Sequence, residues 1–207
     1  PRPIMPIAIN LRLYHRGSLI DQFYWYEQSI SWEEPAPAEK DINHINDLLV
    51  NTIINILDDI NNLSKCKFGF ELFYAKAKPL NELRKPCDTE DAFVLLLSNL
   101  SIIIDDAHLD EIEKILKQKT PEKKSLMLIE KLLEENIGQF DKKFITNLRK
   151  LRTLRNKKFP IHSGEAEAIE ILRELNLPHK PEPKIAARVV LERFRESLES
   201  LRDLLKP

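Results

Sequence analysis

The longest periodic stretch of the chain is helical, and this pattern constrains the fold more than any other feature of the sequence. From about Glu39 to about Leu63, apolar side chains recur every three or four positions. Residues at this spacing share one face of an α-helix. A long amphipathic helix must bury that face against other elements, so the sequence predicts a helical bundle. The apolar positions are Ile42, Ile45, Leu48, Leu49, Ile53, Ile56, Leu57 and Ile60.

Helical patterns continue along most of the remaining chain. Asp88 is the predicted N-cap of a very apolar helix that runs to about Ile104, with Asp91 three residues later as in a capping box. The segment FELFYAKA at 70–77 is interpreted as a short helix. Further helices are expected over 109–118, from Pro121 until Gly138, from Asp141 to Lys157 or Lys158, over 165–175 and over 185–205.

The N-terminal residues follow a different period. Between residues 6 and 32, apolar side chains alternate from Ile7 to Leu13, and HRGS can turn the chain before the aromatic-rich LIDQFYWYEQSISW. Alternation followed by a turn and an aromatic-rich segment predicts a β-hairpin. The sequence therefore predicts a mainly α fold in two parts. These are an N-terminal β-hairpin extension at 1–35 and a helical bundle domain at 36–207.

Composition narrows the functional classes. The 207-residue chain has a formal net charge of −1, so nucleic-acid binding must come from a local patch. Its two cysteines form no CxxC and no Cys/His cluster, so we expect no metal and no cofactor. DDAHLDEIE at 105–113 offers metal-ligating side chains, but an acidic first turn of a helix explains it more simply. No apolar run reaches 18 residues, so we expect no membrane span and a reduced, cytoplasmic setting.

The helix expected from Lys142 to about Lys158 carries arginines on its apolar side. At 100° per residue, Arg155 falls near the centre of the apolar face and Arg152 near its edge, whereas the lysines point outward. Such an arginine either pairs with a carboxylate, such as Asp105, or offers its guanidinium to a phosphate or carboxylate ligand. The residues that define the apolar face are Phe144, Ile145, Leu148, Leu151 and Leu154.

Basic residues are concentrated in the same helix. Residues 141–158 hold 8 basic residues and 1 acidic residue, which leaves 24 basic and 32 acidic residues in the rest of the chain. Charged helix faces usually mix both signs, so this segment favours a polyanionic partner. A solvated charged face is the simpler alternative.

His162 follows this helix closely in sequence, two residues after Pro160. An imidazole titrates near neutral pH and can move protons, and a guanidinium can stabilise the charge of a phosphorane. These two groups suffice for metal-free RNA cleavage, because RNA supplies its own 2′-OH as the nucleophile. A surface or structural histidine is the common alternative.

The residues Arg155-Asn156, five further residues and then His162 resemble the R-x4–6-H motif of the HEPN superfamily, the higher eukaryote and prokaryote nucleotide-binding domains. A polar residue often follows the arginine in that family, as Asn156 does here. The resemblance implies an all-α bundle of four or five helices. It also implies metal-independent endoribonuclease activity in toxin–antitoxin, CRISPR-associated or antiviral systems, and dimers with a composite cleft. An additional acidic or polar residue is expected from an earlier helix, with Asp105 and Asp106 as candidates.

The sequence is therefore interpreted as that of a HEPN-like endoribonuclease, with a toxin or defence protein as the expected setting. RNA, a second copy in a homodimer and a partner protein or antitoxin are the expected partners. The alternative is a non-catalytic helical module whose basic helix binds a nucleic acid or an acidic protein. The predicted catalytic residues are Arg155, His162 and Asn156, and the predicted RNA-binding residues are Lys150, Arg152, Lys157 and Lys158.

Overall fold

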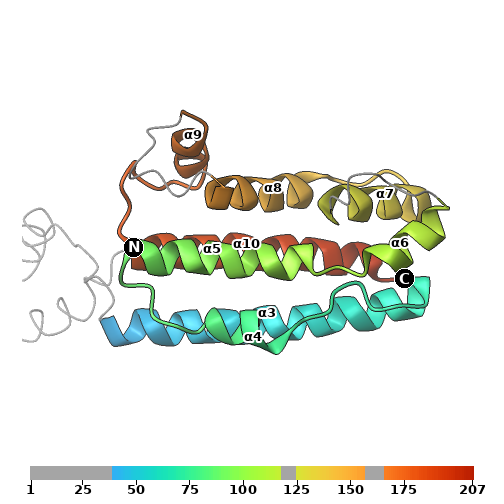
Figure 1. Cartoon of the computed structure of the whole chain (residues 1–207), viewed down its shortest axis with the longest axis horizontal. Helices are drawn as coiled ribbons and strands as arrows, with labels where there is room; N and C mark the ends of the chain where they lie inside the picture. Colours follow the sequence, from blue (N-terminus) through green and yellow to red (C-terminus); the bar gives the residue numbers. More distant parts are fainter. Residues whose placement is uncertain (1–38, 118–124, 157–165) are drawn as a thin grey trace, which may run out of the picture. The chain divides into compact units, whose positions relative to one another are not determined.

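Helices make up all the regular secondary structure in residues 39–117, 125–156 and 166–207, which are the residues that the structure, a computed structural model, describes (Figure 1). The prediction of a mainly α bundle is confirmed for this part of the chain. Its eight helices are α3 (Glu39–Phe68), α4 (Ala77–Glu82), α5 (Glu90–Asp105), α6 (Leu109–Leu116), α7 (Ser125–Ile137), α8 (Lys143–Asn156), α9 (Ala166–Glu174) and α10 (Pro183–Leu205).

The bundle is organised around its last helix. α10 packs along α3 and also contacts α5 and α8. Its buried side chains recur every three or four residues and include the fully enclosed Phe194. In Figure 1, α3 and α8 lie on opposite sides of α10. The apolar faces of these helices meet in one continuous core.

α3 is longer than the sequence pattern predicts. It continues beyond Leu63 to Phe68, because Phe68 also packs against the core. The helix ends where Gly69 adopts a φ of +87°, a conformation that costs glycine little. The Gly69 N–H donates to the Lys65 carbonyl at 3.0 Å and closes the last turn.

The prediction of a short helix at 70–77 is wrong. Residues 70–76 form no helix, and Phe73 makes an isolated antiparallel bridge with Ala107. The buried Asn61 explains the difference. Its Nδ2 donates to the Phe73 carbonyl at 2.8 Å, and its Oδ1 accepts from the Phe73 N–H at 2.9 Å. These bonds take up backbone groups that a helix would pair within itself.

The N-cap of α5 is Thr89, one residue later than predicted. The Thr89 Oγ1 accepts a hydrogen bond from the Ala92 N–H at 3.2 Å. Asp88 instead forms an ion pair with Lys184, in the first turn of α10, at 3.3 Å. The aspartate that was expected to cap α5 thus ties the start of α5 to the start of α10.

Several predictions fall on residues outside the described ranges. The β-hairpin at 6–32 and the helix start at Pro121 are among them, and both stay predictions. The chain divides into two units, Pro1–Ala38 and Glu39–Pro207, and all eight helices named above belong to the second unit. Within the described residues, no helix combines the length and the apolar character needed to cross a membrane.

Candidate functional site

α8 presents the apolar face that the sequence predicts. Its five predicted core positions, from Phe144 to Leu154, are all buried. The Asp141 carboxylate accepts a hydrogen bond from the Lys143 N–H at 2.8 Å, so Asp141 caps the start of α8 from outside the helix. Arg155 lies within the last turn of α8, so the helix does not end before it.

Arg152 and Arg155 converge on one carboxylate, that of Asp105 at the end of α5. The Arg152 Nη1 lies 3.4 Å from Asp105 Oδ1, and the Arg155 Nη1 lies 3.8 Å from Asp105 Oδ2. Ser125, the first residue of α7, donates its hydroxyl to Asp105 Oδ1 at 2.8 Å. We call these four residues, from three helices, the Asp105 cluster. With two guanidiniums and one carboxylate, it carries a net positive charge.

The arginines of the Asp105 cluster are held but not enclosed. Each side chain keeps 32% of its surface exposed. Their contacts with Asp105 are longer than a typical charge-assisted hydrogen bond, so they are mainly electrostatic. Arg155 also donates from Nε to the Asn156 side-chain oxygen at 3.1 Å. A guanidinium carries five N–H donors, and this arrangement leaves donors that can reach an anionic ligand.

Asp106, the other candidate acidic residue, faces a different element. Its Oδ1 binds the Lys76 ammonium at 2.7 Å, on the segment between α3 and α4. Next to it, His108 stacks on Tyr74 with ring centroids 3.6 Å apart. The described residues contain no group of three or more His, Cys, Asp or Glu side chains that could hold a metal ion. Of the two aspartates, only Asp105 reaches the arginines of α8.

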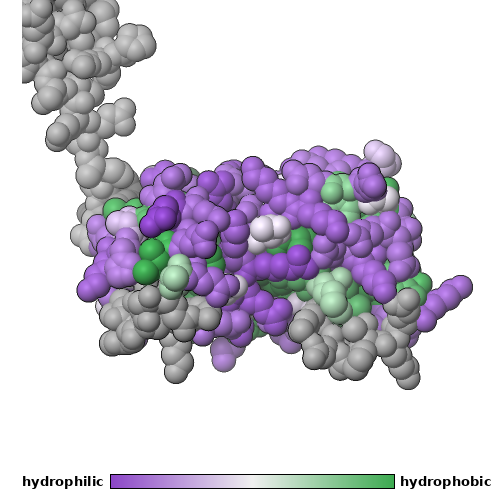
Figure 2. Space-filling model, turned by 90° about the horizontal axis from the view of Figure 1, so that it is seen from above, coloured by the Kyte–Doolittle hydropathy of each residue, from purple (hydrophilic) through white to green (hydrophobic). Residues whose placement is uncertain are grey.

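The other basic residues at α8 are largely neutralised by neighbouring helices. Arg149 pairs with Glu130 of α7 at 2.5 Å, and Lys150 pairs with Glu174 of α9. Lys142 contacts both Glu130, at 3.0 Å, and a second glutamate of α7. The face that carries α7, α8 and α9 is accordingly mainly hydrophilic, with small apolar areas between the polar side chains (Figure 2). The single-sign charge run of the sequence thus becomes a mixed-sign surface in the fold.

Part of the predicted site falls on residues that the structure does not describe. His162, Lys157 and Lys158 lie in the range 157–165. The structure brings Arg155 and Asn156 together, and it places Arg152 one turn before them. The distance between Arg155 and His162 therefore stays a prediction.

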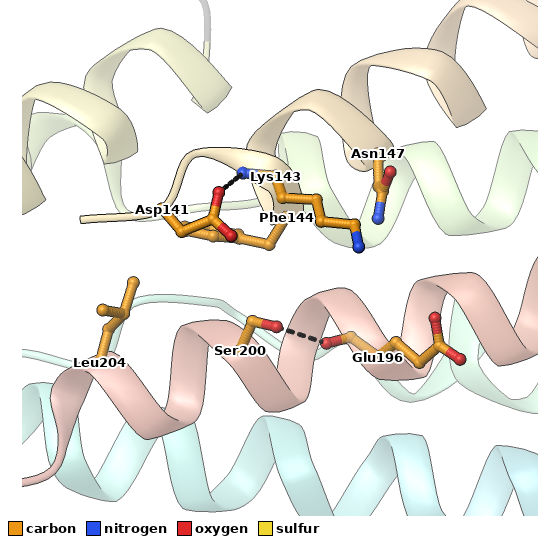
Figure 3. A pocket seen from close by; sticks show the side chains of 7 residues that line it. All are labelled: Asp141, Lys143, Phe144, Asn147, Glu196, Ser200 and Leu204. Atoms are coloured by element: carbon orange, nitrogen blue, oxygen red, sulfur yellow. Dashed lines mark hydrogen bonds between the residues drawn. The ribbon is translucent and has the colours of Figure 1, made fainter.

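A second polar site, which the sequence reasoning missed, lies at the other end of α8. A pocket of about 210 Å³ opens between the start of α8 and the second half of α10 (Figure 3). The Ser200 hydroxyl in its wall donates to the Glu196 carbonyl at 3.0 Å. No sequence signal announces this pocket, because its two walls are more than 50 positions apart. Its lining residues are Asp141, Lys143, Phe144, Asn147, Glu196, Ser200 and Leu204.

Comparisons of the chain with models of protein families, with curated proteins and with solved structures give no match. The arguments for a function therefore come from the residues of the chain and from their geometry. Of the two polar sites, the Asp105 cluster is the one that contains the motif arginine.

Proposed function

We propose that the protein is a HEPN-like, metal-independent endoribonuclease in which Arg155 and His162 perform the chemistry. The observation that carries the proposal is the setting of Arg155. Its guanidinium is oriented by Asp105 and Asn156, yet it remains one-third exposed. A group that is positioned before the substrate arrives, and that still has donors to offer, suits the binding of a phosphate in a transition state.

The proposed reaction needs only the RNA and these side chains. The 2′-OH of one nucleotide attacks the adjacent phosphorus, and its proton leaves. The P–O5′ bond breaks, and the leaving 5′-oxygen takes up a proton. His162 transfers one of these protons, and Arg155 stabilises the charge on the phosphorane. The products are a 2′,3′-cyclic phosphate and a 5′-hydroxyl.

The neighbouring residues have supporting roles in this proposal. Asp105 is the acidic residue from an earlier helix that the family resemblance implies, and it holds the two guanidiniums in place. Arg152 and Lys150 contact the phosphates that flank the cut, together with Lys157 and Lys158. A toxin or defence role, with an antitoxin or other protein partner, belongs to the same proposal.

A second candidate function is a non-catalytic interaction module. The internal pairing of the α8 cations favours it. Lys142, Arg149 and Lys150 all contact glutamates of α7 or α9, so less positive charge is available than the sequence indicates. In this candidate, the exposed parts of Arg152 and Arg155 bind an acidic protein segment or a nucleic acid without cutting it.

Cleavage of single-stranded RNA by the purified chain tests the first candidate. We expect slow cutting near neutral pH that EDTA does not stop. His162→Ala abolishes cleavage but leaves RNA binding largely intact, because it removes a proton carrier. Arg155→Ala impairs both, and Arg155→Lys does not fully restore activity, because an ammonium lacks the planar two-point contact. His179→Ala, at an exposed position between α9 and α10, is the matched control and leaves cleavage unchanged.

The chemistry of the RNA gives an independent check. Replacing the 2′-OH at the cut site by hydrogen must block cutting there, because the nucleophile is gone. Cleavage of the deoxy-substituted RNA, or cleavage by His162→Ala, would refute the mechanism. Binding of RNA or of an acidic protein that depends on Arg155, without any cleavage, would favour the interaction module.

A further inference from the structure

α5 has an apolar stripe on its outward face. The helix is rich in apolar residues on all sides, a pattern typical of a helix that is covered all round. It contacts α4, α7, α8 and α10, yet Leu95 and Ile102 remain 48% and 43% exposed. Ser98 lies between them on the same face and is half-buried. We call Leu95, Ser98 and Ile102 the α5 stripe.

The spacing of the stripe is that of a helix–helix seam. Asp91, Leu95, Ser98, Ile102 and Asp105 follow one another at intervals of four, three, four and three residues. This is the heptad spacing that keeps one face of a helix against a partner helix. Exposed apolar side chains arranged in this way mark a contact surface more strongly than the same residues scattered singly.

We propose that the α5 stripe binds the α5 stripe of a second copy of this chain, with the two helices antiparallel about a twofold axis at Ser98. In this arrangement Leu95 packs against the partner's Ile102, and each stripe is its own complement, as a closed dimer requires. The small Ser98 lies at the crossing point, where it lets the two helices approach closely. This inference does not rest on the ribonuclease proposal.

Charge complementarity selects the second copy and its direction. Asp91 is exposed seven residues before Ser98, and Asp105 lies seven residues after it. Asp91 therefore lies opposite the partner's Asp105 cluster, where Arg152 and Arg155 outweigh one carboxylate. A parallel pair would place Asp91 against the partner's Asp91. The antiparallel pair also aligns the helix dipoles favourably. The partner copy thus supplies a carboxylate to the arginines of the candidate site.

The oligomeric state of the full chain tests the proposal. Light scattering coupled to size-exclusion chromatography should find a dimer that dissociates on dilution. The variant Leu95→Glu with Ile102→Glu should weaken dimerisation by at least about 100-fold, because it places charges in an apolar seam. The matched control is Leu48→Glu with Ile185→Glu, at residues that are 52% and 47% exposed on α3 and α10. We expect this control to dimerise like the wild type.

Cysteine trapping tests the register and does not depend on how the charged variants fold. In a Cys66→Ser background, Ser98→Cys should form a disulfide-linked dimer on mild oxidation, because the two Ser98 positions face each other. Leu95→Cys and Ile102→Cys should cross-link when mixed, whereas Leu95→Cys alone should not. The remaining cysteine, Cys87, is buried. Leu48→Cys is the control and should not cross-link.

Three outcomes would overturn the proposal. The first is a monomer at all concentrations up to about 100 μM, a range in which specific association is measurable. The second is a dimer that keeps its affinity in the Leu95→Glu, Ile102→Glu variant. The third is a cross-link at Leu48→Cys as strong as that at Ser98→Cys. A monomeric chain whose stripe captures a different protein would assign this face to that protein instead.

Discussion

Arg155 shows how an arginine can occupy the apolar side of a helix without becoming a buried charge. Its neighbour Leu154 is fully buried, yet the Arg155 guanidinium reaches Asp105 and keeps one-third of its surface in solvent. A long aliphatic stem can cover apolar surface while its charged head stays at the boundary with water. Pairing with a carboxylate and availability to a ligand, which look like alternatives in the sequence, are therefore both present in the structure.

Asn61 is the residue for which we predict the largest cost of a single polar substitution. Asn61→Ala removes both hydrogen bonds to the Phe73 backbone and leaves a buried N–H and C=O without partners. Each such group costs about 1–3 kcal/mol, so the free energy of unfolding should fall by about 2–4 kcal/mol. Urea denaturation measures the change. Asn62→Ala, at the exposed neighbouring position, is the control and should stay within about 0.5 kcal/mol of the wild type.

An equal and small effect of both asparagine substitutions would contradict this account. It would mean that the segment after α3 is held by its apolar contacts and not by the Asn61 side chain.

At the scale of helices, ion pairs connect α8 to its neighbours, and Glu130 of α7 is the main example. Partial burial acts to raise the pKa of Glu130, but hydrogen bonds and positive charge from Lys142 and Arg149 outweigh it, so the pKa is lowered from its ordinary value. A carboxylate with a lowered pKa in the folded state stabilises the fold above the pKa of the unfolded chain. That contribution disappears as the pH falls through the folded-state pKa.

We therefore predict a pH-dependent effect of Glu130→Gln. At pH 7 the variant should be less stable than the wild type by about 1 kcal/mol, because Lys142 and Arg149 lose a charged partner. The difference should shrink as the pH falls below about 4.3, the ordinary pKa of a glutamate, and vanish below the folded-state pKa. Urea melts at several pH values measure it. Glu134→Gln, which removes a more exposed carboxylate that pairs with Lys142, should show a smaller difference, and a difference for Glu130→Gln that persists at pH 2 would contradict the assignment.

The helices themselves are largely predictable, because apolar periodicity reports on burial of one face. The core positions of α8 from Phe144 to Leu154 follow from the helical pattern alone. The misassigned segment at 70–77 and the misplaced cap at Asp88 share a cause. In both cases a partner distant in sequence, Asn61 or Lys184, decides the local structure. Local pattern carries no record of such partners.

The candidate site is predictable to a smaller extent, for the same reason. Asp105 could be named as a partner of Arg155 because the helical wheel demanded a carboxylate. The glutamates that neutralise α8, such as Glu174, could not, because nothing in the sequence places α9 beside Lys150.

For the molecule as a whole, a net charge of −1 makes the local balance of charge decisive for RNA binding. The last prediction uses this balance. Glu174→Gln removes the acidic partner of Lys150 on α9 and leaves an ammonium available beside the Asp105 cluster. If RNA lies along α8, binding should tighten several-fold at low salt. The slope of log K against log salt should steepen by about 0.7, the value for one added contact to a single-stranded phosphate.

Glu192→Gln on α10 is the matched control, because it changes the net charge equally but removes the partner of Arg188 instead. Its RNA affinity and salt slope should stay close to those of the wild type. Fluorescence anisotropy with a labelled single-stranded RNA, measured at several salt concentrations, compares the three proteins. If both variants tighten binding equally, only the total charge matters. In that case neither Lys150 nor the end of α8 forms the RNA-binding surface.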